Sequence, residues 1–243
     1  IPISKKDGSI RMLKIPTIRD RAWQCLVKYA LEPAHEATFH ARSYGFRTGR
    51  SAHDAQRYVY EQLKRTKSRS NTKKLVIELD IKKCFDRISH RTIIKEMIAP
   101  KGINDGIFRS LKSGINPVFP EQGTPQGGVI SPLLANIALN GIEDIHTSVR
   151  YADDMVIFLK HGEDAEKVLN NIENFLSNRG MQINQEKTKI TEVTKGVDFL
   201  GWECKVCKDG RFRSFPSKDN IDAVRKKLKS IINDRRLSIS VMV

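Results

Sequence analysis

The chain has 243 residues, which is enough for one large domain or two small ones with a sizeable core. Its 43 lysines and arginines against 28 acidic residues give a formal charge of +15, which favours a polyanionic partner and places nucleic acid ahead of an acidic membrane surface. The sequence has no apolar run long enough to span a membrane and no signal-peptide pattern, so we expect no membrane partner.

The first elements predicted are two short strands joined by a turn. A turn signal at residues 5–8 lies between the apolar residues 1–3 and the strand-like residues 10–15. The chain begins at Ile1 inside this hairpin and ends at Val243 after a basic helical pattern, so we interpret both ends as cuts through a longer protein.

Two helices follow, each opened by Ser or Thr with Asp three residues later. The first is predicted over residues 17–32, ending before Pro33, and the second over residues 51–64. Residues 64–74 then carry six basic side chains and no acid. Such a run is usually a solvated loop, and the alternative is contact with a phosphate backbone.

Residues 75–80 alternate as a buried strand that ends on the carboxylate of Asp80. A short helix capped by Ser89 is predicted to reach about Ile98, and Pro132 at the favoured first position opens another that continues through Leu139.

Two adjacent acids, Asp153 and Asp154, lie in a predicted hairpin between the strand-like residues 149–151 and 155–159. Neighbouring carboxylates repel each other unless a cation lies close by, and Mg²⁺ prefers such hard oxygen ligands. The alternative is a solvated Asp-Asp turn, since Asp is common in turns.

An amphipathic helix over residues 164–178, closed by Gly180, and short strands near residues 189–193 and 197–200 complete the pattern. From residue 75 onward the order is strand, helix, helix, hairpin, helix, strand. This order predicts an α+β fold with a ferredoxin-like split βαβ sheet, which brings distant strand ends to one edge.

Carboxylates from separate strands are what metal-assisted nucleotidyl transfer requires, because they hold two Mg²⁺ about 4 Å apart. Asp80 and the Asp153-Asp154 pair fit this requirement, although a lone strand-end Asp is more often a cap. Cys204 and Cys207 form one CxxC pair without the further ligands that structural zinc needs. With four scattered cysteines in all, the thiols indicate a reducing, intracellular compartment rather than a disulfide framework.

Several ordered motifs resemble those of reverse transcriptases. Their amino-acid sequences are most similar to those of the group II intron-encoded enzymes, also called maturases. The polymerase motifs are LDIKKCFD at residues 79–86, GTPQGGVISPLL at 123–134 and YADD at 151–154. RSYGFR at residues 42–47 and FLGW at 199–202 resemble further blocks in the expected order.

The resemblance implies the fingers and palm of a right-hand polymerase. Residues 1–74 would form fingers, 75–216 the palm with a fingers insertion around 95–125, and 217–243 the start of a thumb. It also implies an RNA-directed DNA polymerase that adds dNTPs to a primer 3′-end with two Mg²⁺ ions. The parent protein would assist splicing and mobility of a group II intron in the cytoplasm of a bacterium or in an organelle. Its partners would be an RNA template, a DNA or RNA primer, dNTPs and the intron RNA.

The resemblance assigns roles at the metal site. Asp80 and Asp153 would bind both metals, Asp154 would make a less direct contact, and the Ile81 carbonyl would add an oxygen ligand. Phe85 would lie under the incoming sugar and exclude a 2′-hydroxyl, the alternative being ordinary core packing.

The nucleotide would be bound from two further segments. Gln126 would contact the dNTP, and Gly127 and Gly128 would contact the template. The alternative is that these glycines form an ordinary turn without a binding role. In the N-terminal hairpin, Arg11 would bind the triphosphate together with a lysine. Lys5 is a slightly better match than Lys6 for this second role. The family usually has Pro and Gly after that arginine, where this sequence has Met12 and Lys14.

Three residues are assigned near the primer end. Lys187 would lie near the leaving pyrophosphate, the alternative being a solvated lysine, and Phe199 and Trp202 would form a primer grip, the alternative being packing beneath the thumb. Residues 224–236 suit a thumb helix with an apolar inner and a basic outer face.

Two other functions compete with this one. One is a related bacterial reverse transcriptase, associated with CRISPR adaptation or diversity generation. The other is a non-catalytic RNA-binding splicing factor on the same scaffold. The three acids Asp80, Asp153 and Asp154 argue against a pure binder, which has no need for them.

Overall fold

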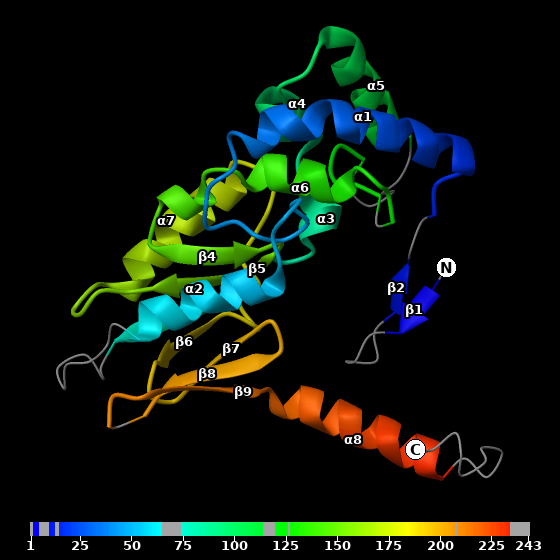
Figure 1. The fold of residues 1–243 in the computed structure, drawn as a ribbon. Helices are drawn as coiled ribbons and strands as arrows, with labels where there is room; N and C mark the ends of the chain where they lie inside the picture. Colours follow the sequence, from blue (N-terminus) through cyan, green and yellow to red (C-terminus); the bar gives the residue numbers. More distant parts are fainter. Residues whose placement is uncertain are drawn as a thin grey trace.

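A four-stranded antiparallel sheet organises the computed structural model (Figure 1). The structure describes residues 2–4, 10–12, 15–64, 74–113, 120–125, 127–207 and 209–233. The sheet has the order β4-β5-β3-β6, with the strands β3 (Leu75–Asp80), β4 (Ser148–Tyr151), β5 (Asp154–Phe158) and β6 (Lys189–Glu192). Numbered from β3 along the chain, this is the order 2-3-1-4 of a split βαβ sheet, which confirms the predicted fold class.

The helices are α1 (Ile18–Glu36), α2 (Ala52–Lys64), α3 (Cys84–Arg87), α4 (His90–Glu96), α5 (Lys101–Lys112), α6 (Ser131–Leu139), α7 (Ala165–Ser177) and α8 (Lys218–Ile232), with a 3₁₀ turn at Ile142–Asp144. The predicted capping pairs are present: Thr17 with Asp20, and Ser51 with Asp54. The helix α7 lies within the predicted range of residues 164–178, and the side chain of Asp164 caps its first turn.

Three helix predictions need correction. The helix α1 continues through Pro33, because proline removes a single N–H and Tyr29, four residues earlier, is exposed so that solvent can satisfy its carbonyl. The helix α4 ends at Glu96, short of Ile98. Its predicted cap, Ser89, makes no side-chain capping bond, and α5 was not predicted at all.

Alternating residues of β3 and β5 divide the core into two clusters. Ile77, Leu79 and Ile157 face helices α1 and α3–α7, whereas Val76 and Val156 face α2 and a second sheet. This is why the sheet lies between α6 and α7 on one side and α2 with β7 and β8 on the other (Figure 1).

The second sheet is formed by β7 (Val197–Phe199), β8 (Trp202–Val206) and β9 (Phe212–Pro216), all antiparallel. The predicted N-terminal hairpin is present as β1 (Pro2–Ser4) and β2 (Ile10–Met12). Of the helices described, none is long and apolar enough to cross a membrane.

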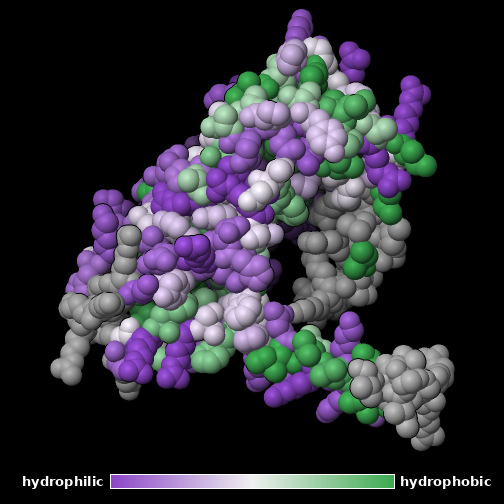
Figure 2. Space-filling view, in the orientation of Figure 1, coloured by the Kyte–Doolittle hydropathy of each residue, from purple (hydrophilic) through white to green (hydrophobic). Residues whose placement is uncertain are grey.

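The helix α8 follows β9 and has no buried residue. An exposed apolar stripe runs along it, formed by Ile221, Val224, Leu228 and Ile232. In the space-filling view, hydrophobic side chains (green) and hydrophilic side chains (purple) lie next to each other along this helix (Figure 2). An amphipathic helix was predicted over residues 224–236, and the structure confirms it for residues 224–232 but begins it earlier, at Lys218. Its apolar face is exposed rather than turned inward, and residues 234–236 lie outside the described residues.

Candidate active site

Three acids meet at one end of the central sheet. Asp80 is the last residue of β3 and lies directly opposite Asp154, the first residue of β5. Asp153 precedes it in the turn, and its carbonyl accepts a hydrogen bond from the Ile81 amide at 3.3 Å. Asp80 and Asp154 are more than 70 residues apart in the sequence. The register of β3 and β5 nevertheless places them opposite each other, roughly one strand spacing apart.

The turn that carries Asp153 has an unusual backbone conformation. Tyr151 pairs with Asp154, so Ala152 and Asp153 form a two-residue hairpin loop. Ala152 has a φ of 58°, in the left-handed region that residues with a Cβ rarely adopt. Gly45 approaches so closely that a Cβ there would overlap the Ala152 nitrogen. The glycine of the RSYGFR segment is thus required by the YADD turn.

Asp80 has two polar neighbours from the segment that follows α7. Its Oδ2 accepts a hydrogen bond from Asn184 Nδ2 at 2.8 Å and lies 3.4 Å from Lys187 Nζ. The Asp80 carbonyl also accepts from the Asn184 amide at 2.8 Å. Asn184 has no motif that would have identified it from the sequence.

The three carboxylates perturb one another. Burial of its carboxyl, and then the charges of Asp153 and Asp80, raise the pKa of Asp154 to about 6, while Lys187 acts in the opposite direction. Beneath the site, burial and then the charge of Asp153 raise the pKa of the Cys84 thiol to about 12. That thiol is therefore neutral and unreactive.

The donor set fits a divalent metal by its chemistry, since carboxylates and a backbone carbonyl are hard oxygen ligands. Among the described residues, no three acidic, histidine or cysteine side chains are grouped closely enough to hold a metal as they stand. Lys187 instead lies beside Asp80 as its cationic neighbour. Metal binding therefore requires the carboxylates to turn toward a common point.

A small cavity of about 180 Å³ opens beside the acids, between the central sheet and β7. Asp80, Asp154, Lys187 and Phe199 line it, as do Glu78 and Asp198. Burial raises the pKa of Glu78 above its ordinary value. The structure thus brings Lys187 and Phe199 to the predicted site.

Phe199 and Trp202 pair across β7 and β8 but have different surroundings. Phe199 is buried in the second core cluster, which agrees with the packing interpretation as well as with a site at the cavity. Trp202 is half-buried, packs against the same cluster and does not line the cavity.

Phe85 lies on α3, one turn beyond the acids. Its ring is half-buried against the main core and meets the exposed ring of Phe46 edge-on, with centroids 6.4 Å apart and an interplanar angle of 81°. It therefore has both a packed side and an accessible side, so core packing and contact with a ligand are compatible here.

The Gly-rich loop depends on its glycines. Gly123 and Gly127 have φ values of 92° and 110°, and a Cβ on Gly123 would lie 2.8 Å from the Asp86 carbonyl oxygen. A Cβ on Gly128 would lie 2.7 Å from Ser131 Oγ. An ordinary turn would not need glycine at all of these positions.

A buried glutamine of α1 holds this loop in place. Gln24 is 3% exposed, and its Oε1 accepts a hydrogen bond from the Val129 amide at 2.8 Å. Ser131 Oγ donates to the Pro125 carbonyl at 2.7 Å. Gln126 and Lys5 lie outside the described residues, and Arg11 is placed only by its backbone in β2.

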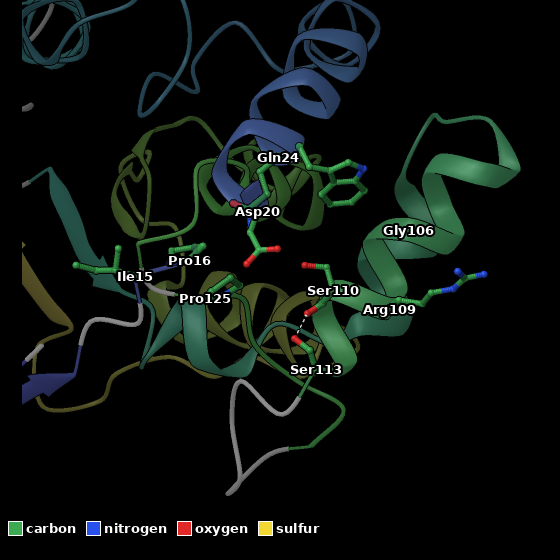
Figure 3. A pocket seen from close by; sticks show the side chains of 10 residues that line it. Ile15, Pro16, Asp20, Gln24, Gly106, Arg109, Ser110, Ser113 and Pro125 are labelled. Atoms are coloured by element: carbon green, nitrogen blue, oxygen red, sulfur yellow. Dashed lines mark hydrogen bonds between the residues drawn. The ribbon is translucent and has the colours of Figure 1, made fainter. Parts of the chain in front are cut away.

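Next to the loop lies a larger cavity of about 580 Å³ between α1 and α5 (Figure 3). Asp20 and Ser110 point toward each other across it, Pro125 of the Gly-rich loop lies at its edge, and Arg109 points away. The Trp23 indole lies against Gly106, where a Cβ would be 2.8 Å from its Cζ2. The sequence alone did not indicate this cavity, because α5 was missed.

Comparison with known proteins identifies the class of molecule that this sheet and its acids define. The profile of the reverse transcriptase (RNA-dependent DNA polymerase) family matches residues 3–204. The chain therefore belongs to the reverse transcriptase family.

Individual proteins that resemble the chain indicate which members of this family it is similar to. It is 37% identical to Maturase-like protein 1 of Euglena gracilis, over 90% of this chain and 48% of that protein. It is 28% identical to the group II intron-encoded protein LtrA of Lactococcus lactis subsp. cremoris, over 87% of this chain and 47% of that protein. The chain thus spans about half the length of these relatives.

Solved structures agree on the fold. Telomerase from Candida tropicalis in complex with a TWJ fragment of telomeric RNA superposes with a TM-score of 0.62 at 15% identity, covering 93% of this chain and 47% of the telomerase. The apo telomerase of the same organism gives 0.61 at 14% identity, over 85% and 46% of the two chains. The chain has the reverse transcriptase fold, with fingers and palm.

Proposed function

We propose that this chain forms the fingers and palm of an RNA-directed DNA polymerase of group II intron type. The observation that carries the proposal is the convergence of Asp80, Asp153 and Asp154 at one end of β3 and β5. The assigned boundaries are residues 1–74 for the fingers, 75–216 for the palm and 217–243 for the start of the thumb.

Reverse transcriptases use divalent metal ions, and in our proposal these are two Mg²⁺. Asp80 and Asp153 would bind both ions, Asp154 would support them, and the Ile81 carbonyl would complete the oxygen set. When bound, such ions lower the pKa of an attacking hydroxyl and stabilise the leaving pyrophosphate. Lys187, whose Nζ lies 3.4 Å from Asp80 Oδ2, would neutralise the phosphate charge that develops once Asp80 turns toward a metal.

The incoming dNTP would lie over the half-buried ring of Phe85, which meets the exposed Phe46 ring edge-on. Exclusion of a 2′-hydroxyl by the Phe85 ring would select dNTPs over rNTPs. Gln126 would contact the same nucleotide, and Lys5 and Arg11 would bind its triphosphate.

The template would pass the Gly-rich loop at Gly127 and Gly128 and reach the cavity between α1 and α5. That cavity adjoins the loop at Pro125 and offers the Trp23 indole, on which an unpaired base can stack. Phe199 and Trp202 would hold the primer end from the β7–β8 hairpin.

The maturase-like and intron-encoded relatives support a group II intron as the source of the RNA partner. The full-length protein would then assist splicing and mobility of that intron. These relatives come from Euglena gracilis and from the bacterium Lactococcus lactis. We therefore infer a nucleic-acid-associated protein of a bacterium or an organelle.

Primer extension on an RNA template with Mg²⁺ tests the proposal, using the full-length protein, Asp153→Ala and, as a matched control, Asp144→Ala. Asp144 is a largely exposed acid outside the site, with a side chain 71% exposed. We expect extension by the wild type and the control, and loss of at least about 10³-fold in Asp153→Ala, comparable to the loss of a key transition-state contact. An inactive wild type would contradict the enzyme function, and an active Asp153→Ala would contradict the site.

A further inference from the structure

A fully buried arginine lies directly beneath the YADD turn. Arg150, in β4, is 1% exposed, and its guanidinium is bound from three separate segments. Its Nε donates to Glu143 Oε1 at 2.5 Å, its Nη1 to Asn136 Oδ1 at 3.0 Å and its Nη2 to Ser43 Oγ at 2.7 Å. These partners lie in the 3₁₀ turn, in α6 and in the RSYGFR segment, so the guanidinium joins elements far apart in the sequence.

The same guanidinium holds the turn itself. Arg150 Nη1 also donates to the Ala152 carbonyl at 3.1 Å. That carbonyl belongs to the peptide group that leads into Asp153, so its orientation sets the direction of the Asp153 Cα–Cβ bond. Without such support, the left-handed conformation of Ala152 costs roughly 1–3 kcal/mol.

The RSYGFR segment closes on the turn from the other side. The Tyr44 amide donates to the Arg150 carbonyl at 2.9 Å, and Asn136 Nδ2 donates to the Gly45 carbonyl at 2.9 Å. Gly45 leaves no room for a Cβ beside Ala152. The turn is therefore held between the Arg150 guanidinium below and the Gly45 backbone beside it.

Stability alone does not account for this arrangement. Glu143 is fully buried, and its Oε2 has no hydrogen-bond partner among the described residues. Desolvation of a buried ion pair offsets much of its attraction, and apolar replacements are often as stable. What an apolar residue cannot replace is the donor to the Ala152 carbonyl.

We propose that Arg150 is a positioning residue for nucleotidyl transfer: its guanidinium, oriented by Glu143, Asn136 and Ser43, fixes the left-handed Ala152 turn that presents Asp153 to the other acids. This inference rests on the proposed function. It assigns Arg150 no contact with substrate or metal.

The test uses Arg150→Lys, Ala152→Gly and the double variant in the full-length protein. Lysine keeps the charge but carries only three donors on a single atom, so it cannot make the four bonds that the Arg150 guanidinium makes from its three nitrogens. We expect Arg150→Lys to lower kcat by roughly 10–100-fold and to raise the Mg²⁺ concentration for half-maximal activity, as loss of a residue that orients a ligand does. Glycine adopts a positive φ without support. The double variant should therefore recover part of the activity that Arg150→Lys loses, and Ala152→Gly alone measures the effect of glycine in the turn itself.

A second readout does not depend on activity. Mn²⁺ binding, followed by electron paramagnetic resonance without nucleic acid or nucleotide, should weaken in Arg150→Lys and recover in the double variant. The control is Ile172→Val, a buried core change in α7 far along the chain from the turn, which should lower the melting temperature without changing Mn²⁺ affinity. If the wild type binds Mn²⁺ through the acids but extends no primer, the proposed function fails while the positioning role is still tested.

A folded Arg150→Lys with unchanged kcat and Mn²⁺ affinity would overturn the proposal, as would a loss that Ala152→Gly does not relieve. If Arg150→Lys does not fold, Gly45→Ala takes its place, because an added Cβ displaces the turn while the ion pair remains intact. Weakened Mn²⁺ binding by folded Gly45→Ala supports the role of the turn geometry, and unchanged binding contradicts it.

Discussion

Asp153 and Asp154 are neighbours in the sequence, yet they occupy different environments in the structure. Asp154 begins β5 opposite Asp80, and burial of its carboxyl together with the two other acids raises its pKa to about 6. Asp153 lies in the turn, where the backbone is fixed by Ala152 and the contacts of Arg150. This difference agrees with the proposed roles, in which Asp153 is the more direct ligand.

The raised pKa of Asp154 predicts a pH dependence of the metal-free protein. From its ordinary value of 3.8 up to about 6, the folded state binds the proton more tightly than the unfolded state. The contribution of this group to the free energy of unfolding therefore decreases as the pH rises through that interval. Asp154→Asn cannot titrate, so its stability relative to wild type should increase from about pH 4 to about pH 6.

Urea denaturation with EDTA present measures this difference, and Asp144→Asn is the control for loss of an exposed acid. A wild-type-minus-variant difference that is constant across the interval would contradict the shifted pKa.

A second residue-scale prediction concerns Phe85. Replacing its ring with the smaller Phe85→Val side chain should open space for a 2′-hydroxyl and reduce discrimination against rNTPs by roughly 10–200-fold. The ratio of kcat/KM for dCTP and CTP, which differ only in the 2′-hydroxyl, measures it. Phe108→Val, on α5, is the matched control because Phe108 is also partly exposed but lies away from the acids. Unchanged discrimination in Phe85→Val would leave Phe85 with a packing role only.

Among the elements, the pair α1 and α5 forms the cavity beside the Gly-rich loop. Gln24 fixes the loop and Trp23 lies against Gly106, so loop and cavity share one helix as a support. The cavity is accordingly the place where a template base is expected to stack.

Trp23→Ala should weaken binding of an RNA template overhang by roughly 5–150-fold, since stacking on an aromatic side chain contributes about 1–3 kcal/mol per base. Fluorescence anisotropy with a primer–template bearing a single-stranded overhang measures the Kd. Leu26→Ala removes an apolar side chain from an exposed position of the same helix, 71% exposed, and should have no effect. Equal affinities of Trp23→Ala and wild type would place the template elsewhere.

For the whole molecule, the formal charge of +15 predicts binding that depends strongly on salt. The helix α8 contributes exposed Lys226, Lys227 and Lys229 beside its apolar stripe. If these contact phosphates, replacing all three with glutamine should lower the slope of log Kd against log salt concentration by about 2, at about 0.7 per contact on a single strand.

The matched control replaces Lys160, Lys167 and Lys195, which are exposed on other elements. It removes the same charge, and we expect a smaller change in slope. Equal slopes in the two triple variants would show that overall charge, rather than α8, determines the salt dependence.

Local patterns were sufficient wherever the forces are local. The capping pairs of α1 and α2, the alternation of β3 and the Asp-Asp hairpin depend on residues a few positions apart, and the structure confirms them. The order of elements likewise predicted the split βαβ sheet. Pro33 was misjudged because its cost depends on whether the freed carbonyl is exposed, which a local pattern does not contain.

The sequence by itself determined the family motifs, the three acids and the sheet that brings them together. Only the tertiary structure placed Asn184 against Asp80 and the Arg150 guanidinium against Ser43, 107 residues away. It also made the cavity between α1 and α5. The physical reason is that strands and caps are specified by neighbours along the chain, whereas a buried polar network or a cavity depends on how distant segments pack.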